Sequence, residues 1–255
     1  MLTAIELRVL GCLIEKQMTT PEQYPLTLNG LIAGCNQSTN REPVVNYSAA
    51  HVTEGLDGLR ADHKLARVVH SGAGSRVDKF KHVVDERLQL TPSESAILAV
   101  LMLRGPQTLG ELKARTERLF GFADLHSVDR VLDRLADPTV SPDPKEYPTR
   151  SDAGMLRSSI SMPEMPDGYA RPWDGPLIER LPRLPGQKEA RVAQLLGGPI
   201  DLDALTSPPA TSGGFVESSG GSWRERVGAL EAEVGQLTEQ LANLQREFHE
   251  FRQQF

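Results

Sequence analysis

The sequence predicts a mainly α-helical protein with small β-hairpins, an α+β fold in which one module occurs twice and a long helix follows. Three observations predict it. Amphipathic helices are indicated three times in residues 1–87 and three times in residues 88–197, and a helix start signal precedes five of these six. Each set of three is followed by a candidate hairpin. An unbroken apolar heptad then runs through residues 223–255.

The first module, residues 1–87, opens with a capping box formed by Thr3 and Glu6. Thr27 can cap a second helix, and a third begins near Ser48. A glycine-containing turn at residues 71–75 then separates two extended segments, residues 65–70 and 76–84, which is a hairpin pattern. The apolar stripes of the three helices are Ile5, Val9, Cys12 and Leu13; Leu28, Leu31, Ile32 and Cys35; and Val52, Leu56 and Leu59.

The second module, residues 88–197, repeats this order. Thr91-Pro92-Ser93-Glu94 combines a cap, a proline at the first helical position and a capping glutamate, and Gly105-Pro106 ends that helix. Thr108 and Glu111 cap a second helix. A third carries Val128, Val131, Leu132 and Leu135 at i, i+3, i+4 and i+7, and a hairpin is expected over residues 177–196, around a Pro185-Gly186 turn.

Three short helices followed by a two-stranded wing describe the winged-helix variant of helix-turn-helix. A plain three-helix bundle would leave residues 65–84 unexplained. The sequence therefore predicts tandem winged-helix domains. A proline-rich insertion at residues 137–176 separates the third helix of the second domain from its wing.

The C-terminal part is predicted to be a coiled coil on a tether. Residues 198–222 are rich in Gly, Ser and Pro, which is typical of a flexible linker, and residues 223–255 form the heptad helix. Leucine at d with valine at a favours a parallel homodimer, although the helix could instead fold back on its own domain. The candidate dimerisation residues are Val227, Leu230, Val234, Leu237, Leu241, Leu244 and Phe248.

Charge and composition leave nucleic-acid binding open. The net charge is −6, but most of the acidic excess lies in residues 198–255, so the two modules are near neutral. No apolar run is long enough to span a membrane and no secretion signal opens the chain, so we expect a cytoplasmic protein without membrane contact. Cys12 and Cys35 lie on apolar stripes and are expected to be buried hydrophobic side chains. No spacing indicates a metal site or a cofactor.

Several sequence motifs closely resemble the YceH-like family of bacterial proteins of unknown function. They are Gly11-Cys12-Leu13-Ile14-Glu15-Lys16-Gln17, Thr19-Thr20-Pro21-Glu22-Gln23-Tyr24-Pro25-Leu26, Cys35-Asn36-Gln37, Thr39-Asn40-Arg41-Glu42-Pro43-Val44, Arg104-Gly105-Pro106-Gln107-Thr108, Gly110-Glu111-Leu112 and Pro185-Gly186-Gln187-Lys188-Glu189 with Arg191. The resemblance covers most of the chain. It implies a tandem winged-helix fold and no particular activity.

The leading functional hypothesis is double-stranded DNA binding by a non-enzymatic regulatory protein. The first hairpin carries cations on both strands, and polar residues between the second and third helices could donate to phosphates or bases. Such polar residues also cap helices and form turns, and surface strands often carry solvated charges. The candidate nucleic-acid-binding residues are Asn36, Gln37, Asn40, Arg41, Arg67, Arg76, Lys79 and Lys81.

The third helices are the weak point of that hypothesis, because acidic residues facing a phosphate backbone repel it. The expected outward residues are Ala49, Ala50, Thr53, Glu54, Asp57 and Arg60 in the first module and Asp129, Arg130, Asp133 and Arg134 in the second. The alternative hypothesis is a protein-interaction scaffold that is dimerised by the coil. An enzyme is not expected. The Gly-x-Gly of residues 71–75 joins two strands and does not lead into a helix, and no catalytic spacing emerges.

Overall fold

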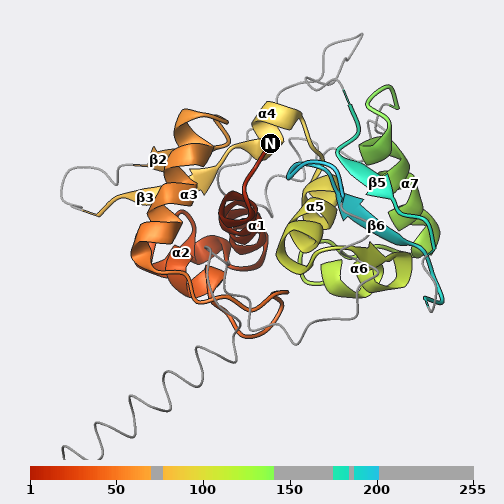
Figure 1. The fold of residues 1–255 in the computed structure, drawn as a ribbon, viewed down its shortest axis with the longest axis horizontal. Helices are drawn as coiled ribbons and strands as arrows, with labels where there is room; N and C mark the ends of the chain where they lie inside the picture. Colours follow the sequence, from red (N-terminus) through yellow and green to blue (C-terminus); the bar gives the residue numbers. More distant parts are fainter. Residues whose placement is uncertain (70–76, 141–174, 184–186, 201–255) are drawn as a thin grey trace, which may run out of the picture. The chain divides into compact units, whose positions relative to one another are not determined.

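The computed structural model describes residues 1–69, 77–140, 175–183 and 187–200, all of which belong to one compact unit (Figure 1). In these residues the protein is a mixed α+β structure, as predicted, with seven α-helices and two small antiparallel sheets. Most of the predicted linker, the predicted coiled coil with its dimerisation residues, most of the proline-rich insertion, Arg76 and both hairpin turns lie outside the described residues.

The first module begins each of its three helices at the predicted cap. Thr3 and Glu6 close a reciprocal capping box, while Thr27 and Ser48 each accept a hydrogen bond from a backbone N–H in the first turn of their helix. The elements in chain order are α1 (Ala4–Thr19), the 3₁₀ turn η1 (Pro21–Gln23), β1 (Leu26–Thr27), α2 (Leu28–Cys35), α3 (Ala49–Ala61), β2 (Ala66–Val69) and β3 (Lys79–His82).

The second module repeats this order after a short connecting helix, α4 (Val84–Leu88). Capping boxes at Thr91, Thr108 and Asp124 start its three helices. Asp124 was not among the predicted caps. The elements are α5 (Pro92–Arg104), β4 (Gln107–Thr108), α6 (Leu109–Thr116), α7 (Leu125–Ala136), β5 (Ile178–Arg180) and β6 (Arg191–Gln194).

Each module also contains a two-residue strand that the sequence did not predict. β1 pairs with β3, and β3 with β2; in the second sheet β4 pairs with β6, and β6 with β5. Both sheets therefore place the last strand in the centre. The short strand ties the start of the second helix to the hairpin, which fixes the hairpin against the helices of its own module.

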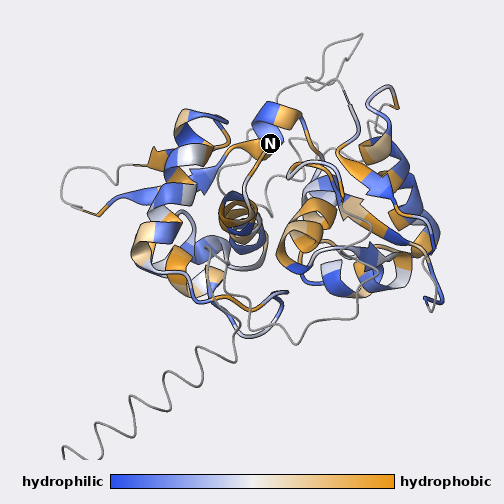
Figure 2. Cartoon of the chain, viewed as in Figure 1, coloured by the Kyte–Doolittle hydropathy of each residue, from blue (hydrophilic) through white to orange (hydrophobic). Residues whose placement is uncertain are grey.

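The helices α1 and α5 pack against each other and join the two modules (Figure 1). Gly11 on α1 permits this close approach, because a Cβ there would lie 3.0 Å from Leu103 Cγ and 3.1 Å from Met102 Cβ on α5. The helix α5 is largely apolar in Figure 2, and its residues Ser93–Leu103 are all buried. The buried side chains of both modules form a single hydrophobic cluster. The division into separate domains at residues 87 and 88 stays a prediction.

None of the helices in the described ranges combines the length and the apolar character that crossing a bilayer requires.

Candidate nucleic-acid interface

Three predicted cations share the outer face of the first sheet. Arg67 lies directly opposite Lys81 in the antiparallel register, and Lys79 is two residues before Lys81 on the same strand. Cross-strand partners and residues two apart point to the same side of a sheet. The opposite side carries buried Ala66 and His82 and faces the core. Arg67, Lys79 and Lys81 therefore form one surface, which we call the cationic face.

A carboxylate that sequence reasoning missed lies against this cationic face. Glu86 on α4 places Oε2 3.2 Å from Arg67 Nη2 and Oε1 3.8 Å from Lys81 Nζ. The side chains of Arg67, Lys81 and Glu86 are 51%, 24% and 33% exposed. No ion pair of Lys79 occurs within the part of the chain that the structure describes. The face thus carries three cations and one bridging anion, all in contact with solvent.

The loop between α2 and α3 contains four of the candidate residues, and side-chain hydrogen bonds from Asn36 and buried Arg8 hold its backbone in place. Asn36 bridges to the backbone of Tyr47 through two hydrogen bonds: its Nδ2–H donates to the carbonyl (2.9 Å), and its Oδ1 accepts from the amide (2.8 Å). Buried Arg8 donates to the carbonyls of Cys35 (3.1 Å) and Pro43 (2.6 Å). Asn36 therefore maintains the loop conformation, and Gln37 beside it is half-buried.

Arg41 points into the protein. Its side chain is fully buried, and it donates from Nη1 and Nη2 to both carboxylate oxygens of Glu15, at 3.1 and 2.5 Å, and from Nε to the Gly34 carbonyl at 3.0 Å. Burial acts to lower the Arg41 pKa, but the hydrogen bonds and the negative charge of Glu15 outweigh it and raise that pKa overall. Since no part of this guanidinium faces solvent, we leave Arg41 out of the proposed interface.

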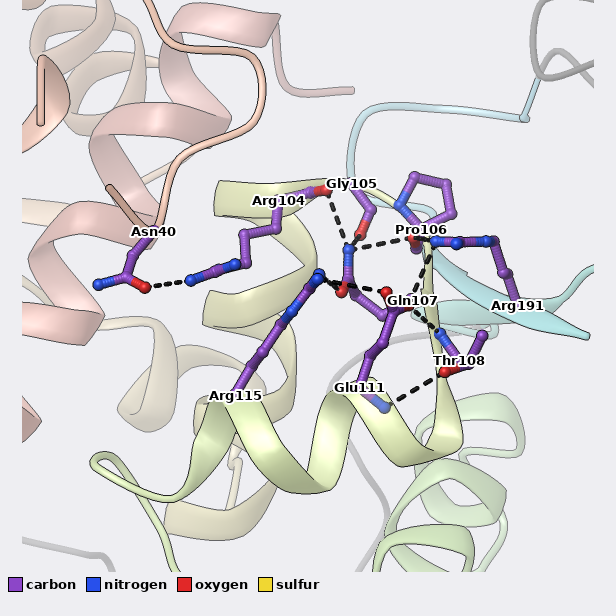
Figure 3. A network of polar contacts seen from close by, with 9 residues as sticks. All are labelled: Asn40, Arg104, Gly105, Pro106, Gln107, Thr108, Glu111, Arg115 and Arg191. Carbon is purple, nitrogen blue, oxygen red and sulfur yellow. Dashed lines mark hydrogen bonds and ion pairs between the residues drawn. The ribbon is translucent and has the colours of Figure 1, made fainter. Parts of the chain in front are cut away.

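Asn40 connects the loop to the second module (Figure 3). It adopts a left-handed backbone conformation with φ 59°, and its Oδ1 accepts a hydrogen bond from Arg104 Nη2 at the end of α5. The Glu42 amide donates to the Leu103 carbonyl at 2.8 Å. The loop is therefore attached to the C-terminal end of α5 through both a side chain and the backbone.

The residues beyond Arg104 continue this polar network (Figure 3). Gln107 Nε2 donates to the carbonyls of Arg104, Gly105 and Pro106, which lie at the end of α5. Glu111 accepts from Arg115 and Arg191, both at 3.2 Å. Motif segments that are far apart in the sequence, around Asn40, Arg104 and Arg191, thus converge at the junction between the modules.

The outward face of the third helix differs between the modules. On α3, all six residues predicted to face outward are exposed, which confirms that prediction. On α7, the prediction for Arg134 was wrong: this side chain is buried, and its Nε lies 3.3 Å from Glu94 Oε1. Arg134 flanks the apolar stripe of α7, so the helix turns it toward the start of α5. At this position Arg134 compensates the negative charge of Glu94, whose burial without a cationic partner would be strongly unfavourable.

The two aspartates on the outer side of α7 share one arginine of the second hairpin. Arg180 on β5 lies 2.8 Å from Asp129 Oδ1 and 2.7 Å from Asp133 Oδ1. All three side chains are at least two-fifths exposed. The repulsion of phosphates that we expected from these two carboxylates is therefore reduced, and Arg130 remains exposed beside them.

A small cavity lies between α1, α4 and α5, with a volume of about 30 Å³ and a lining that includes Met18, His82 and Ser95. This volume fits one or two water molecules and no metabolite. In the described ranges, no three His, Cys, Asp or Glu side chains gather in a way that could hold a metal ion.

Comparison with known proteins gives a family match across most of the chain. The family model described as "Protein of unknown function, DUF480" matches residues 2–146. A UPF0502 protein of Geobacter sulfurreducens is 42% identical over 257 residues, which cover 100% of this chain and 98% of that protein. A UPF0502 protein of Pelobacter propionicus is also 42% identical, with 98% and 96% covered. The UPF0502 protein YceH of Salmonella newport is 40% identical over 248 residues, with 95% of each chain covered.

Proposed function

The chain belongs to the DUF480 family, whose function is unknown, and we propose that it is a non-enzymatic, cytoplasmic protein that binds double-stranded DNA through tandem winged helices. The resemblance to YceH-like proteins drawn from the sequence motifs is confirmed by this membership. The names of the relatives state no activity, so the proposal depends on the geometry of the described residues.

The order of elements supports the winged-helix part of the proposal. In each module a short strand lies between the first and second helices, and a hairpin follows the third helix. A winged helix places its third helix toward the DNA major groove and its hairpin toward the backbone. The single observation that carries the DNA proposal is the cationic face, where Arg67, Lys79 and Lys81 lie together on the solvent side of the first hairpin.

The charged residues on the exposed face of α3 limit how strongly the protein can discriminate between DNA sequences. Its exposed face includes Glu54 and Asp57, the latter paired with Arg60 at 3.2 Å. Carboxylates do not read guanine and they repel phosphates. We therefore propose that contacts to phosphates dominate and that sequence preference is weak.

Fluorescence anisotropy of a labelled duplex across a salt series tests the proposal. The wild-type protein should bind, and the logarithm of its affinity should fall linearly with the logarithm of the salt concentration. The double variant Lys79→Glu with Lys81→Glu should lose binding while keeping its far-UV circular dichroism and Tm. Arg87→Glu with Arg118→Glu, which reverses two exposed cations outside the cationic face and the third helices, is the matched control and should retain most of the affinity. Unchanged binding by the double variant, or no binding by the wild type at low salt, would overturn the proposal.

A second candidate function is protein interaction, and one observation favours it. Phe120, in the turn between α6 and α7, and Leu125, the first residue of α7, are 37% and 47% exposed, and Phe120 packs edge-on against Phe122 with ring centroids 4.9 Å apart. Exposed apolar side chains of this kind can anchor a protein partner. Such binding would respond weakly to salt, whereas phosphate binding responds steeply.

We also propose that the protein forms a homodimer, because residues 223–255 carry the heptad pattern described above. Sedimentation equilibrium of the full chain against a variant with Leu237→Asp and Leu244→Asp tests this. A monomeric wild type would overturn it.

A further inference from the structure

We propose that Glu86 on α4 is an internal competitor for phosphate, so that a nucleic-acid backbone engages Arg67 and Lys81 only by taking the place of this carboxylate. This inference rests on the proposed DNA-binding function and concerns the regulation of affinity at the same face. Glu86 would thereby lower the affinity of the protein for DNA.

The position of Glu86 carries the inference. Arg67 and Lys81 come from different strands and are direct cross-strand neighbours. Glu86 contacts both, with one carboxylate oxygen toward each cation. Its helix follows directly after β3, since only Val83 separates β3 from α4. The carboxylate therefore stands where a phosphate group bridging the two cations would bind.

The chemistry of the exchange is close to balanced. A carboxylate and a phosphodiester each carry one negative charge and accept hydrogen bonds from the same donors. A phosphate that replaces Glu86 gains one contact with Arg67 and one with Lys81, while the protein loses the two contacts that Glu86 made with the same cations. Glu86, still nearby, then repels the incoming phosphate. Binding at Arg67 and Lys81 thus contributes little net free energy in the wild-type protein.

Lys79 stands apart from this competition. It lies on the same face, and in the described ranges it has no carboxylate partner. We therefore expect Lys79 to make the first phosphate contact and Arg67 with Lys81 to add to it only when Glu86 is displaced. The second module has a related arrangement, in which Asp129 and Asp133 on α7 hold Arg180 of the hairpin.

The conservative variant Glu86→Gln tests the inference. It removes the charge, retains the shape and frees both cations, so duplex affinity should rise about twofold to tenfold. The slope of log affinity against log salt should steepen by up to about 0.9, as expected for one additional phosphate contact. Tm should change little, because all three side chains are partly exposed.

Glu22→Gln is the matched control. It removes one exposed acidic charge from η1 in the same module, outside both α3 and the cationic face, and so measures the general effect of net charge on DNA affinity. The inference holds if Glu86→Gln gains more affinity than Glu22→Gln and if the extra gain disappears when Arg67→Gln and Lys81→Gln are added.

Equal gains in the two variants would overturn the inference while leaving the proposed function intact. A loss of affinity in Glu86→Gln would also overturn it, because Glu86 would then be holding the cations in position for phosphate. Absence of duplex binding by both the wild type and Glu86→Gln at low salt would overturn the proposed function and this inference together.

Discussion

Arg41 and Glu15 form a buried ion pair in which each carboxylate oxygen of Glu15 accepts a hydrogen bond from a separate guanidinium nitrogen of Arg41. Arg41 comes from the loop after α2, and Glu15 lies near the end of α1, 26 residues earlier. The pair thus fastens the loop that carries Asn36, Gln37 and Asn40 onto the first helix.

We predict that Arg41→Ala lowers the free energy of unfolding by about 3 kcal/mol, because the largely buried Glu15 carboxylate loses both guanidinium hydrogen bonds and keeps only Lys16 Nζ, at 3.7 Å, as a cationic partner. Urea denaturation followed by circular dichroism measures this. Gln37→Ala, in the same loop, is the matched control and should cost less than about 1 kcal/mol. A fully stable Arg41→Ala protein that has lost DNA binding would return Arg41 to the list of contact residues.

We predict that Gly11→Val destabilises the protein by about 1–3 kcal/mol, because its side chain would press on Leu103 and Met102 where α1 meets α5. Gly110→Val is the matched control. A Cβ at Gly110 on α6 would meet no atom within 4 Å. Thermal denaturation of both variants gives the comparison, and equal Tm values would show that α1 and α5 do not need this close approach.

The stability of the protein should depend on pH through His82. Burial lowers the pKa of His82 to about 3, whereas the unfolded chain should show about 6.5. Between about pH 6.5 and about pH 3, the folded state therefore binds fewer protons than the unfolded state. As a result, the free energy of unfolding decreases as the pH falls through this range. The loss is roughly 1.4 kcal/mol per pH unit.

Asp85 acts in the opposite sense. Its Oδ1 lies 3.6 Å from His82 Nδ1, and burial raises its pKa. Its folded form therefore takes up a proton more readily, which adds stability as pH falls and offsets part of the His82 loss. His82→Phe should remove the acid-induced loss in urea midpoints between about pH 6.5 and about pH 4. His126→Gln, which removes an exposed histidine, should keep it. An unchanged pH profile in His82→Phe would contradict the role of His82.

We predict that Asn40→Ala destabilises the protein more than Asn40→Gly, by about 1 kcal/mol. Both variants lose the hydrogen bond to Arg104, but only glycine accepts the φ of 59° without strain. Urea denaturation of the two variants measures the difference in their free energies of unfolding, which reports the backbone strain at position 40. Equal stabilities would mean that the loop relaxes to a negative φ when the side chain is removed.

The local features of this fold could be predicted from the sequence because they depend on neighbours along the chain. Capping residues such as Thr3 and Thr91 satisfy amides three residues away, and apolar side chains at helical spacing define the buried faces of α1 and α7. The alternation of Lys79 and Lys81 likewise follows from the period of a strand. The six main helices, the pairing of the strands within each hairpin and the shared face of Lys79 and Lys81 could therefore be predicted from the sequence.

Only the tertiary structure decided which charged side chains are exposed to a binding partner and which are buried in ion pairs. Arg41 and Arg134 look like surface arginines in the sequence, yet each is buried against a carboxylate 26 or 40 residues away. Glu86 reaches the cationic face only because β2 and β3 pair and α4 turns back beside them. The strands β1 and β4 are too short to show a period of their own and exist through pairing with β3 and β6. Helix caps and periodicity are local, whereas ion pairs and sheet pairing join distant residues, so only the folded chain determines them.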